Sequence, residues 1–200
     1  MNPHIHYGHD TDAEAQFDPS NPLYDRVRRL FDPIKQGSLV LDMGCNSGGF
    51  GRRLLDLKPS CTVIGVDVAE HLLPLARKKG YLMALPVPAE CLPPRWERLF
   101  DYVVMSELLE HVEDPVACVR EARRVLKPGG VLLGDVPTCF GKWGYRTILG
   151  HKWHRRVFTK RKLRRLLHTQ FTETKIGLAP AWFEPSRRFW LPQWYTWEAK

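Results

Sequence analysis

The stretch VLDMGCNSGG (residues 40–49) decides the fold of this chain, because a short apolar run leads directly into closely spaced glycines. An apolar run without polar alternation is typical of a strand that is buried on both faces of a parallel sheet. Glycine lets the backbone turn sharply and approach a ligand closely. The stretch therefore predicts a buried strand followed by a ligand-binding loop.

The alternation of apolar runs and helical segments continues on both sides of this stretch. Because strands that alternate with helices form parallel sheets covered on both faces, the sequence predicts an α/β fold. The expected sheet is doubly wound, Rossmann-like and mostly parallel. Strands are expected at 38–42, 61–67, 81–87, 100–105, 131–136 and 171–177; helices at 21–33, from Phe50 through Leu55, at 70–79, 114–126 and 159–168; and a turn at 127–130.

Length and composition are those of a single globular domain. The chain has 200 residues, of which 44% are hydrophobic and 26% charged, and these values exclude wholesale disorder. We expect a polar N-terminal arm (1–20) and one domain (21–200), which includes a basic segment (137–168) and an aromatic tail (181–200). No apolar run is long enough to span a membrane, and the N-terminus lacks an apolar signal core. The five cysteines form no CxxC pair, so we expect reduced thiols in a cytoplasmic protein.

The glycine loop does not fit a dinucleotide. A dinucleotide site needs GxGxxG, and Asn46 replaces the glycine that lets the backbone approach the pyrophosphate. Asp42 would also place a carboxylate near a diphosphate, so it favours a cationic ligand instead. Asp67 ends the second expected strand, where an acid can accept hydrogen bonds from both ribose hydroxyls. The alternative for Asp67 is a cap on the helix at Glu70.

A family resemblance covers roughly residues 36–177 and rests on five segments: VLDMGCNSGG (40–49), GVDVAE (65–70), AECLP (89–93), FDYVVMSELLEHVEDP (100–115) and VLKPGG (125–130). In this order and spacing they resemble the class I S-adenosylmethionine-dependent methyltransferases, the broad type that includes ubiquinone-biosynthesis and many small-molecule O-methyltransferases. Asn46 replaces the middle glycine of the usual loop, a change that the backbone geometry of asparagine tolerates. Pro88 stands where the family often has an aspartate that binds the adenine amino group.

The resemblance implies S-adenosylmethionine as cofactor and assigns its contacts residue by residue. The methionine part would lie against Asp42, Gly44 and Gly48, and the ribose against Asp67. The remaining contacts that it implies are Ala89 and Glu90 beside the adenine, and Ser106 and Glu107 at the methyl-transfer site.

Histidines are the candidates for proton removal. A hydroxyl acceptor must lose its proton, which is work for a histidine or a carboxylate. His111 follows the fourth expected strand, and His154 lies in the basic segment, where relatives of the resembled family place residues that close over the substrate. His151 is a weaker candidate. If Glu107–His111 is helical, Glu107, Glu110 and His111 share a face. The resemblance implies that such a group can hold a divalent metal, although we expect no metal there.

The charge points to an anionic acceptor. The chain carries +8 in total, and residues 137–171 alone carry +10 without an acid, so the rest is left with −2. We therefore expect a methyltransferase, monomeric or weakly dimeric, that acts on a hydroxyl of an anionic small molecule. The alternatives are an RNA methyltransferase that uses the basic surface, and a non-catalytic domain of the same fold that binds an anionic partner. The tryptophan-rich tail is expected to line an acceptor pocket, to pack in the core, to form a dimer contact or to form a last antiparallel strand.

Overall fold

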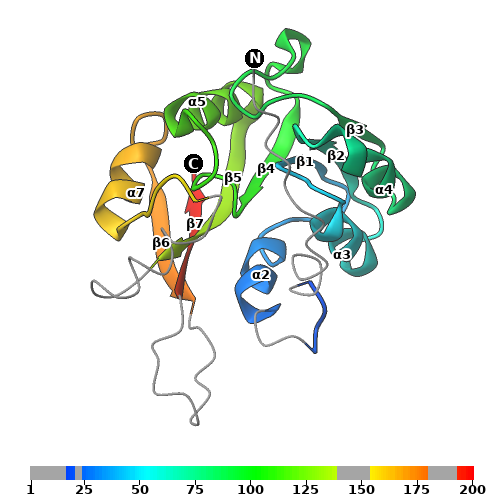
Figure 1. Cartoon of the computed structure of the whole chain (residues 1–200), viewed down its shortest axis with the longest axis horizontal. Coiled ribbons are helices and arrows are strands. Elements are labelled where there is room, and N and C mark those ends of the chain that lie inside the picture. Colours follow the sequence, from blue (N-terminus) through cyan, green and yellow to red (C-terminus); the bar gives the residue numbers. More distant parts are fainter. Residues whose placement is uncertain (1–16, 21–23, 139–153, 180–192) are drawn as a thin grey trace.

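The computed structural model describes residues 17–20, 24–138, 154–179 and 193–200. The strands are β1 (Leu39–Met43), β2 (Thr62–Val66), β3 (Met83–Leu85), β4 (Phe100–Ser106), β5 (Leu126–Thr138), β6 (Thr174–Ala179) and β7 (Gln193–Ala199). They form one seven-stranded sheet in the order β3-β2-β1-β4-β5-β7-β6 (Figure 1). β7 runs antiparallel to both of its neighbours, β5 and β6, and the other described strand pairs are parallel. The mostly parallel sheet that the sequence predicts is therefore confirmed, including the alternative of a last antiparallel strand.

Helices cover both faces of the sheet (Figure 1). The described helices are α2 (Tyr24–Phe31), α3 (Gly49–Leu57), η1 (Glu70–Leu72), α4 (Leu73–Lys78), η2 (Pro94–Trp96), α5 (Pro115–Val125) and α7 (Lys160–Leu167). One hydrophobic core joins the sheet to α2, α3 and α4, and the other joins it to α5 and α7. Trp197 is 3% exposed in the second core, which confirms core packing for this residue of the aromatic tail. Residues 180–192 of the tail lie outside the described part of the chain.

Two helices begin at the residues that the sequence predicts. The Asp114 carboxylate accepts hydrogen bonds from the backbone N–H groups of Val116 and Ala117, at 2.9 and 3.0 Å. The Thr159 hydroxyl accepts one from Lys162 N at 3.2 Å. Because each side chain satisfies a backbone donor in the first turn, it fixes where the helix starts. The start of α7 at Lys160 places the preceding residues, including His154, beside the sheet.

The starts of β5 and β6 are among the boundaries that differ from the expected ones. Residues 127–130 were expected to form a turn, but they belong to β5, which starts at Leu126 and pairs with Phe100 of β4 through a register shift. Gly129 has a φ of 77°, which accommodates this irregularity. β6 starts at Thr174 instead of residue 171, because Phe171 packs in the core beside α7. Residues 127–130 have no partner in β4, because the pairing passes directly from Phe100 with Leu126 to Tyr102 with Val131, so they form an irregular excursion within β5.

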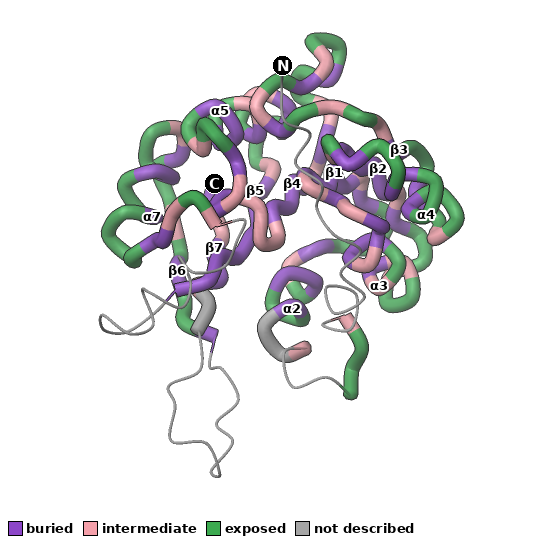
Figure 2. The backbone as a smooth tube through the Cα atoms, in the orientation of Figure 1, coloured by how far each residue is buried: buried purple, intermediate pink, exposed green. Residues whose placement is uncertain are grey.

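The central strands are buried along most of their length (Figure 2). Apolar side chains on both faces explain why these strands have near-continuous hydrophobic sequences. No helix within the described ranges is long and apolar enough to cross a bilayer. Because the faces of these central strands are covered, a ligand can reach them at the edge where the strands end.

Candidate functional site

The loops that follow the parallel strands meet at one edge of the sheet. The chain order reverses between β1 and β4, which are neighbours in the sheet and are followed by loops that lead to opposite faces. In open α/β sheets ligands bind at the carboxyl ends of the strands at such a switch point. The predicted cofactor residues lie at or just after the carboxyl ends of β1, β2, β3 and β4, so the fold brings all four groups to this edge.

The loop after β1 has the backbone geometry that its glycines predict. Gly44 and Gly48 have φ angles of 81° and 87°, and Asn46 has a φ of 48°. This left-handed region is strained for most residues but is open to glycine and tolerated by asparagine. A Cβ on Gly48 would also lie 2.7 Å from Ala76 Cα. The loop is therefore a tight cradle without side chains at positions 44 and 48, and the replacement of its middle glycine by Asn46 is accommodated as expected.

Asp67 fixes this loop from the neighbouring strand. One carboxylate oxygen accepts a hydrogen bond from Asn46 N at 2.8 Å, and the other accepts one from Ala69 N at 2.8 Å. The second bond closes a local turn, but Asp67 does not cap the helix at Glu70, because the N-cap residue of η1 is Ala69 and no described side chain caps that helix. Each carboxylate oxygen has a further lone pair, so Asp67 can also accept hydrogen bonds from a ligand.

Asp42 is buried beneath the loop and is held by Tyr81. The carboxylate is 2% exposed and accepts a 2.6 Å hydrogen bond from the Tyr81 hydroxyl. Burial, with a contribution from the charge of Asp67, raises the pKa of Asp42 to about 7, although the Tyr81 hydrogen bond opposes the shift. A cation bound nearby would favour the ionised carboxylate. This pair of acids therefore suits a positively charged ligand.

The loops after β3 and β4 complete the edge. Ala89 is 7% exposed, and the Glu90 carboxylate accepts a hydrogen bond from Glu113 N at 3.2 Å, which ties the two loops together. Ser106 Oγ is buried and has no hydrogen-bond partner among the described residues. A buried hydroxyl in this position is available to a ligand. Together with the glycine cradle and the two acids, it fits the cofactor that the sequence predicts.

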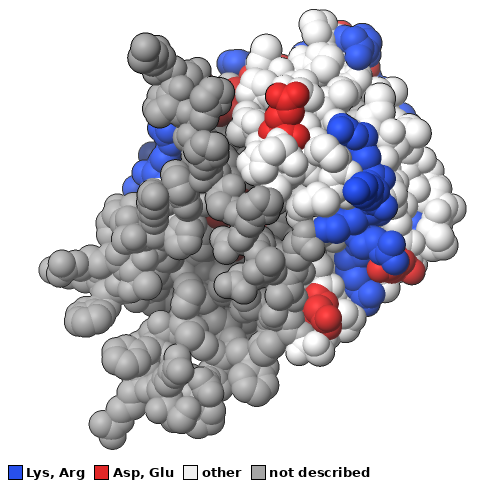
Figure 3. Space-filling model, turned by 45° about the vertical axis from the view of Figure 1, so that its right-hand side comes forward, with Lys and Arg blue, Asp and Glu red and all other residues white. Residues whose placement is uncertain are grey.

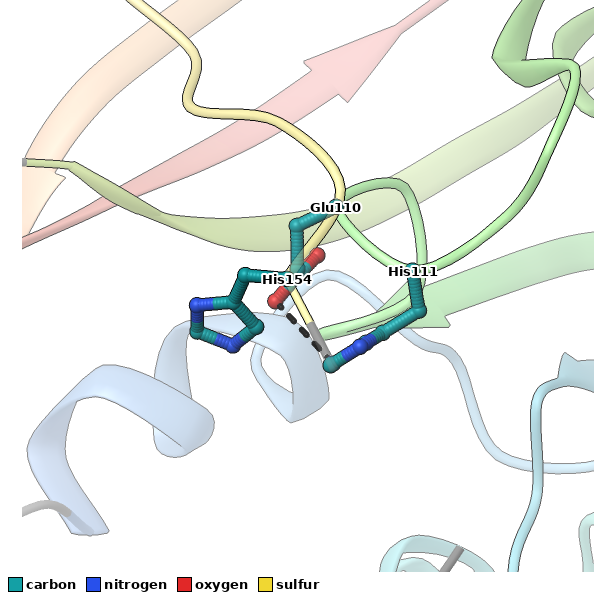
Figure 4. A group of neighbouring side chains, drawn as sticks. All are labelled: Glu110, His111 and His154. Carbon is teal, nitrogen blue, oxygen red and sulfur yellow. Dashed lines mark ion pairs between the residues drawn. The ribbon is translucent and has the colours of Figure 1, made fainter. Parts of the chain in front are cut away.

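The loop after β4 also carries a histidine cluster, but not the one expected. Glu107 adopts a left-handed φ of 48°, and its N–H donates to the backbone and the carboxylate of Asp135, so residues 107–111 are not helical. Glu107 is not in the cluster of ligand atoms that the described residues form, which differs from the group of Glu107, Glu110 and His111 that the resemblance implied. His154 takes its place, since Glu110, His111 and His154 offer ligand atoms within 4.8 Å of one another (Figure 4).

The cluster combines a buried carboxylate with two imidazoles. His111 Nε2 lies 3.8 Å from a carboxylate oxygen of Glu110, which is 1% exposed. The rings of His111 and His154 have centroids 4.9 Å apart. A carboxylate beside an imidazole stabilises its protonated form, as a general base requires once it has accepted a proton. The two histidines that the sequence offered as separate candidates therefore form one group.

Arg156 holds the two halves of this cluster together. Its guanidinium donates hydrogen bonds to the carbonyls of Leu109, Val112 and Glu113 in the loop after β4. The backbone N–H of Arg155 donates to the Glu110 carbonyl at 2.9 Å. From the sequence, Arg156 belongs to the cations expected to face an anionic acceptor. In the structure its guanidinium instead binds the segment around His154 to the loop after β4. Its only sequence signal is its place beside a candidate histidine.

We expect Arg156→Met to destabilise the fold by about 2 kcal/mol, because three carbonyls lose a charged donor. Urea unfolding followed by circular dichroism measures this loss. The matched control is Arg155→Met, since the exposed Arg155 side chain has no hydrogen bond to a described residue. We expect the control to change the free energy of unfolding by less than about 0.5 kcal/mol. Equal effects of the two variants would contradict the anchoring role.

The exposed cations are divided between two regions. α7 carries Lys160, Arg161, Lys162, Arg164 and Arg165, all exposed, while its leucines face the core. Figure 3 shows that Lys and Arg side chains also gather on the side of the molecule where α3 and α4 lie. Exposed lysines and arginines thus also lie outside the basic segment, although the net positive charge of the chain comes from that segment. His151, Lys142, Arg146 and Lys152 lie outside the described residues.

Comparison with known families and proteins identifies similar sequences. The family model described as a methyltransferase domain matches residues 9–170. The ubiquinone biosynthesis O-methyltransferase of Dinoroseobacter shibae is 36% identical over 115 residues, 55% of this chain and 45% of that protein. The Bordetella avium enzyme of the same name is 34% identical over 128 residues, 60% of this chain and 52% of that protein. The chain therefore spans about half the length of these curated relatives.

Solved structures share the fold over most of the chain. A SAM-dependent methyltransferase from Archaeoglobus fulgidus has a TM-score of 0.73 at 19% identity and covers 96% of this chain and 100% of its own. A SAM-dependent methyltransferase from Thermotoga maritima has a TM-score of 0.70 at 22% identity and covers 88% of each chain. At these identities the similarity establishes the architecture alone.

Proposed function

Because the chain belongs to the class I S-adenosylmethionine-dependent methyltransferases, we propose that it methylates a hydroxyl group of a small molecule that carries an anionic group. The observation that carries this proposal is the group of Glu110, His111 and His154 beside the end of β4. A neutral amine can attack a methyl group with its lone pair, whereas a hydroxyl must be deprotonated. A carboxylate-paired imidazole at the edge of the sheet supplies the base that the second reaction needs.

The residues of the edge would hold S-adenosylmethionine, which supplies an activated methyl group and its own leaving group. Asp42, Gly44 and Gly48 would hold the methionine part, Asp67 the ribose, and Ala89 and Glu90 the adenine. Ser106 and Glu107 would line the transfer site. The protein then has to place the acceptor oxygen in line and exclude water, and such positioning contributes about 7–11 kcal/mol in well-oriented reactions. His111 and His154 would take the hydroxyl proton.

The anionic character of the acceptor is supported by the charge of the chain around His154. Residues 137–171 contain ten lysines and arginines and no acid. Of these, Arg155 is exposed beside the histidine cluster, while Arg156 is occupied by backbone carbonyls. An arginine that can form paired hydrogen bonds recognises a carboxylate or a phosphate. We infer that the acceptor presents such a group close to its hydroxyl.

A metabolite extract incubated with the protein and methyl-labelled S-adenosylmethionine tests the proposal. We expect the labelled product to bind an anion-exchange resin and to carry the methyl group on oxygen, as fragmentation in a mass spectrometer determines. Calorimetry with S-adenosylhomocysteine is the companion measurement. Labelling on nitrogen, or in a cationic product, would contradict the acceptor chemistry, whereas no binding at millimolar ligand would contradict the enzymatic function itself.

An RNA acceptor is the second candidate, because five exposed cations of α7 make no ion pair with a described residue. Cations that contact phosphates give an affinity that falls steeply with salt. If RNA is the acceptor, tRNA should be retained at about 150 mM salt and released with a steep salt dependence. Charge reversal at Arg161 and Arg165 would then weaken retention, and label would appear in the RNA fraction of the extract.

A further inference from the structure

Tyr81 occupies a slot that three glycines make for it. A Cβ on Gly51 would lie 2.3 Å from the Tyr81 ring, and Cβ atoms on Gly65 and Gly48 would lie 2.9 and 3.0 Å from it. Gly51 and Gly65 have no positive φ, so backbone geometry does not require glycine at either position. Glycine inside a helix or a strand often marks the close approach of another group. Here that group is the Tyr81 ring.

The slot directs the Tyr81 hydroxyl to two parts of the proposed cofactor site at once, namely β1 and α3. The hydroxyl donates to Asp42 at 2.6 Å and accepts a hydrogen bond from Gly51 N, in the first turn of α3, at 2.8 Å. Burial raises the pKa of the Tyr81 phenol well above its usual value, so the hydroxyl keeps its proton and remains a donor. Tyr81 therefore joins the buried acid to the helix that follows the glycine loop.

We propose that Tyr81 is a positioning residue of the cofactor site, which holds the Asp42 carboxylate in the ionised, oriented form that receives a cationic ligand. The inference rests on the function proposed above. The ionisable groups that face Asp42 are the Tyr81 phenol, the Cys45 thiol of the glycine loop and Asp67 after β2. None of them carries a positive charge. The Tyr81 hydroxyl is the hydrogen-bond donor that the structure gives the Asp42 side chain among the described residues.

The ratio of two affinities isolates this role. S-adenosylmethionine carries one positive charge more than S-adenosylhomocysteine, so the ratio of their association constants reports the charge of the acids around the site. In the wild-type protein the pKa of Asp42 is about 7, and we expect the ratio to rise as the pH increases through that value. Titrations that affect both ligands equally cancel in the ratio. The measurement is calorimetry on both sides of pH 7 and requires no turnover.

Tyr81→Phe keeps the ring in its slot and removes the donor. We expect it to weaken S-adenosylmethionine binding about tenfold at pH 7, the value of one hydrogen bond to a charged group, and to move the midpoint of the ratio to higher pH. The matched control is Tyr102→Phe, which removes a buried hydroxyl that donates to the Pro33 carbonyl at 2.9 Å. The control should keep the wild-type midpoint.

An unchanged midpoint in folded Tyr81→Phe would show that Tyr81 only fills space and would overturn the proposal. A second variant keeps the test decisive if Tyr81→Phe does not fold. Asp42→Asn retains an acceptor for the Tyr81 hydroxyl but cannot ionise, so its ratio should not change with pH. If the ratio still rises as in the wild type, Asp42 is not the group that is coupled to the ligand charge. Failure of the wild-type protein to bind either ligand would instead contradict the proposed function.

Discussion

Replacing either His111 or His154 with glutamine is expected to lower kcat for methyl transfer about 10²- to 10⁴-fold, the usual contribution of a positioned general base. Both imidazoles lie in one group with the buried Glu110 carboxylate, which stabilises the proton that the base accepts. Neither histidine is among the residues assigned to the cofactor, so S-adenosylhomocysteine affinity should change less than about twofold. Single-turnover rates with labelled cofactor and calorimetry measure the two quantities separately.

The control for both variants is His168→Gln. His168 is exposed at the end of α7, where its ring makes a 3.2 Å hydrogen bond with the Thr174 hydroxyl, and it should leave kcat unchanged. The double variant at 111 and 154 is expected to be scarcely slower than the slower single variant, because residues that act as a unit are non-additive. If the kcat losses of the two single variants multiply in the double variant, the two histidines do not form a single proton-accepting group.

Chelation separates proton removal from metal binding in the same cluster. Two imidazoles and a carboxylate are also donors that suit a transition metal. Because we assign the cluster to proton transfer, dialysis against a chelator should leave kcat unchanged. If activity is lost on dialysis and returns with added Zn²⁺, the three residues bind a metal and do not accept the proton.

Asp67→Ala is expected to weaken S-adenosylhomocysteine binding at least about 100-fold. The change removes the proposed ribose acceptor and also the acceptor of Asn46 N, which holds the strained loop residue at φ 48°. A hydrogen bond to a charged group contributes about 1.5–3 kcal/mol, so the loss of two such interactions reaches this range. Calorimetry of both proteins at one pH gives the ratio directly.

An analogue of the ligand divides that effect between its two causes. S-adenosylhomocysteine without its ribose 2′-hydroxyl should bind the wild-type protein more weakly, but should bind Asp67→Ala as the parent ligand does. If both proteins distinguish equally between the parent ligand and the analogue, Asp67 stabilises the loop but does not bind the ribose. Asp56→Ala is the control, because Asp56 is an exposed acid of α3 that pairs with Arg52 at 3.1 Å and lies outside the proposed site.

Local sequence was sufficient to predict most of the strands and the cofactor edge. Apolar runs that end in glycine or aspartate predict β1 and β2 with their loops, because burial on both faces removes polar alternation. The caps Asp114 and Thr159 predict the starts of α5 and α7, since each depends on a bond within its own turn. The predicted cofactor residues all lie at or just after the ends of strands, and parallel pairing alone brings these ends to one edge.

Tertiary structure decided what depends on contacts between distant segments. His154 joins His111 because Arg156 binds the carbonyls of the loop after β4, and no local pattern encodes that pairing. Tyr81 reaches Asp42 because glycines from two other elements leave room for its ring. Residues 127–130 lie inside β5 without a partner in β4, because the strand pairs at Leu126 and again only from Val131 onward. The sequence by itself determined most of the elements and where their carboxyl ends lie, since those depend on local burial and capping. Which side chains act together was decided only by packing, because it depends on the space and partners that distant segments provide.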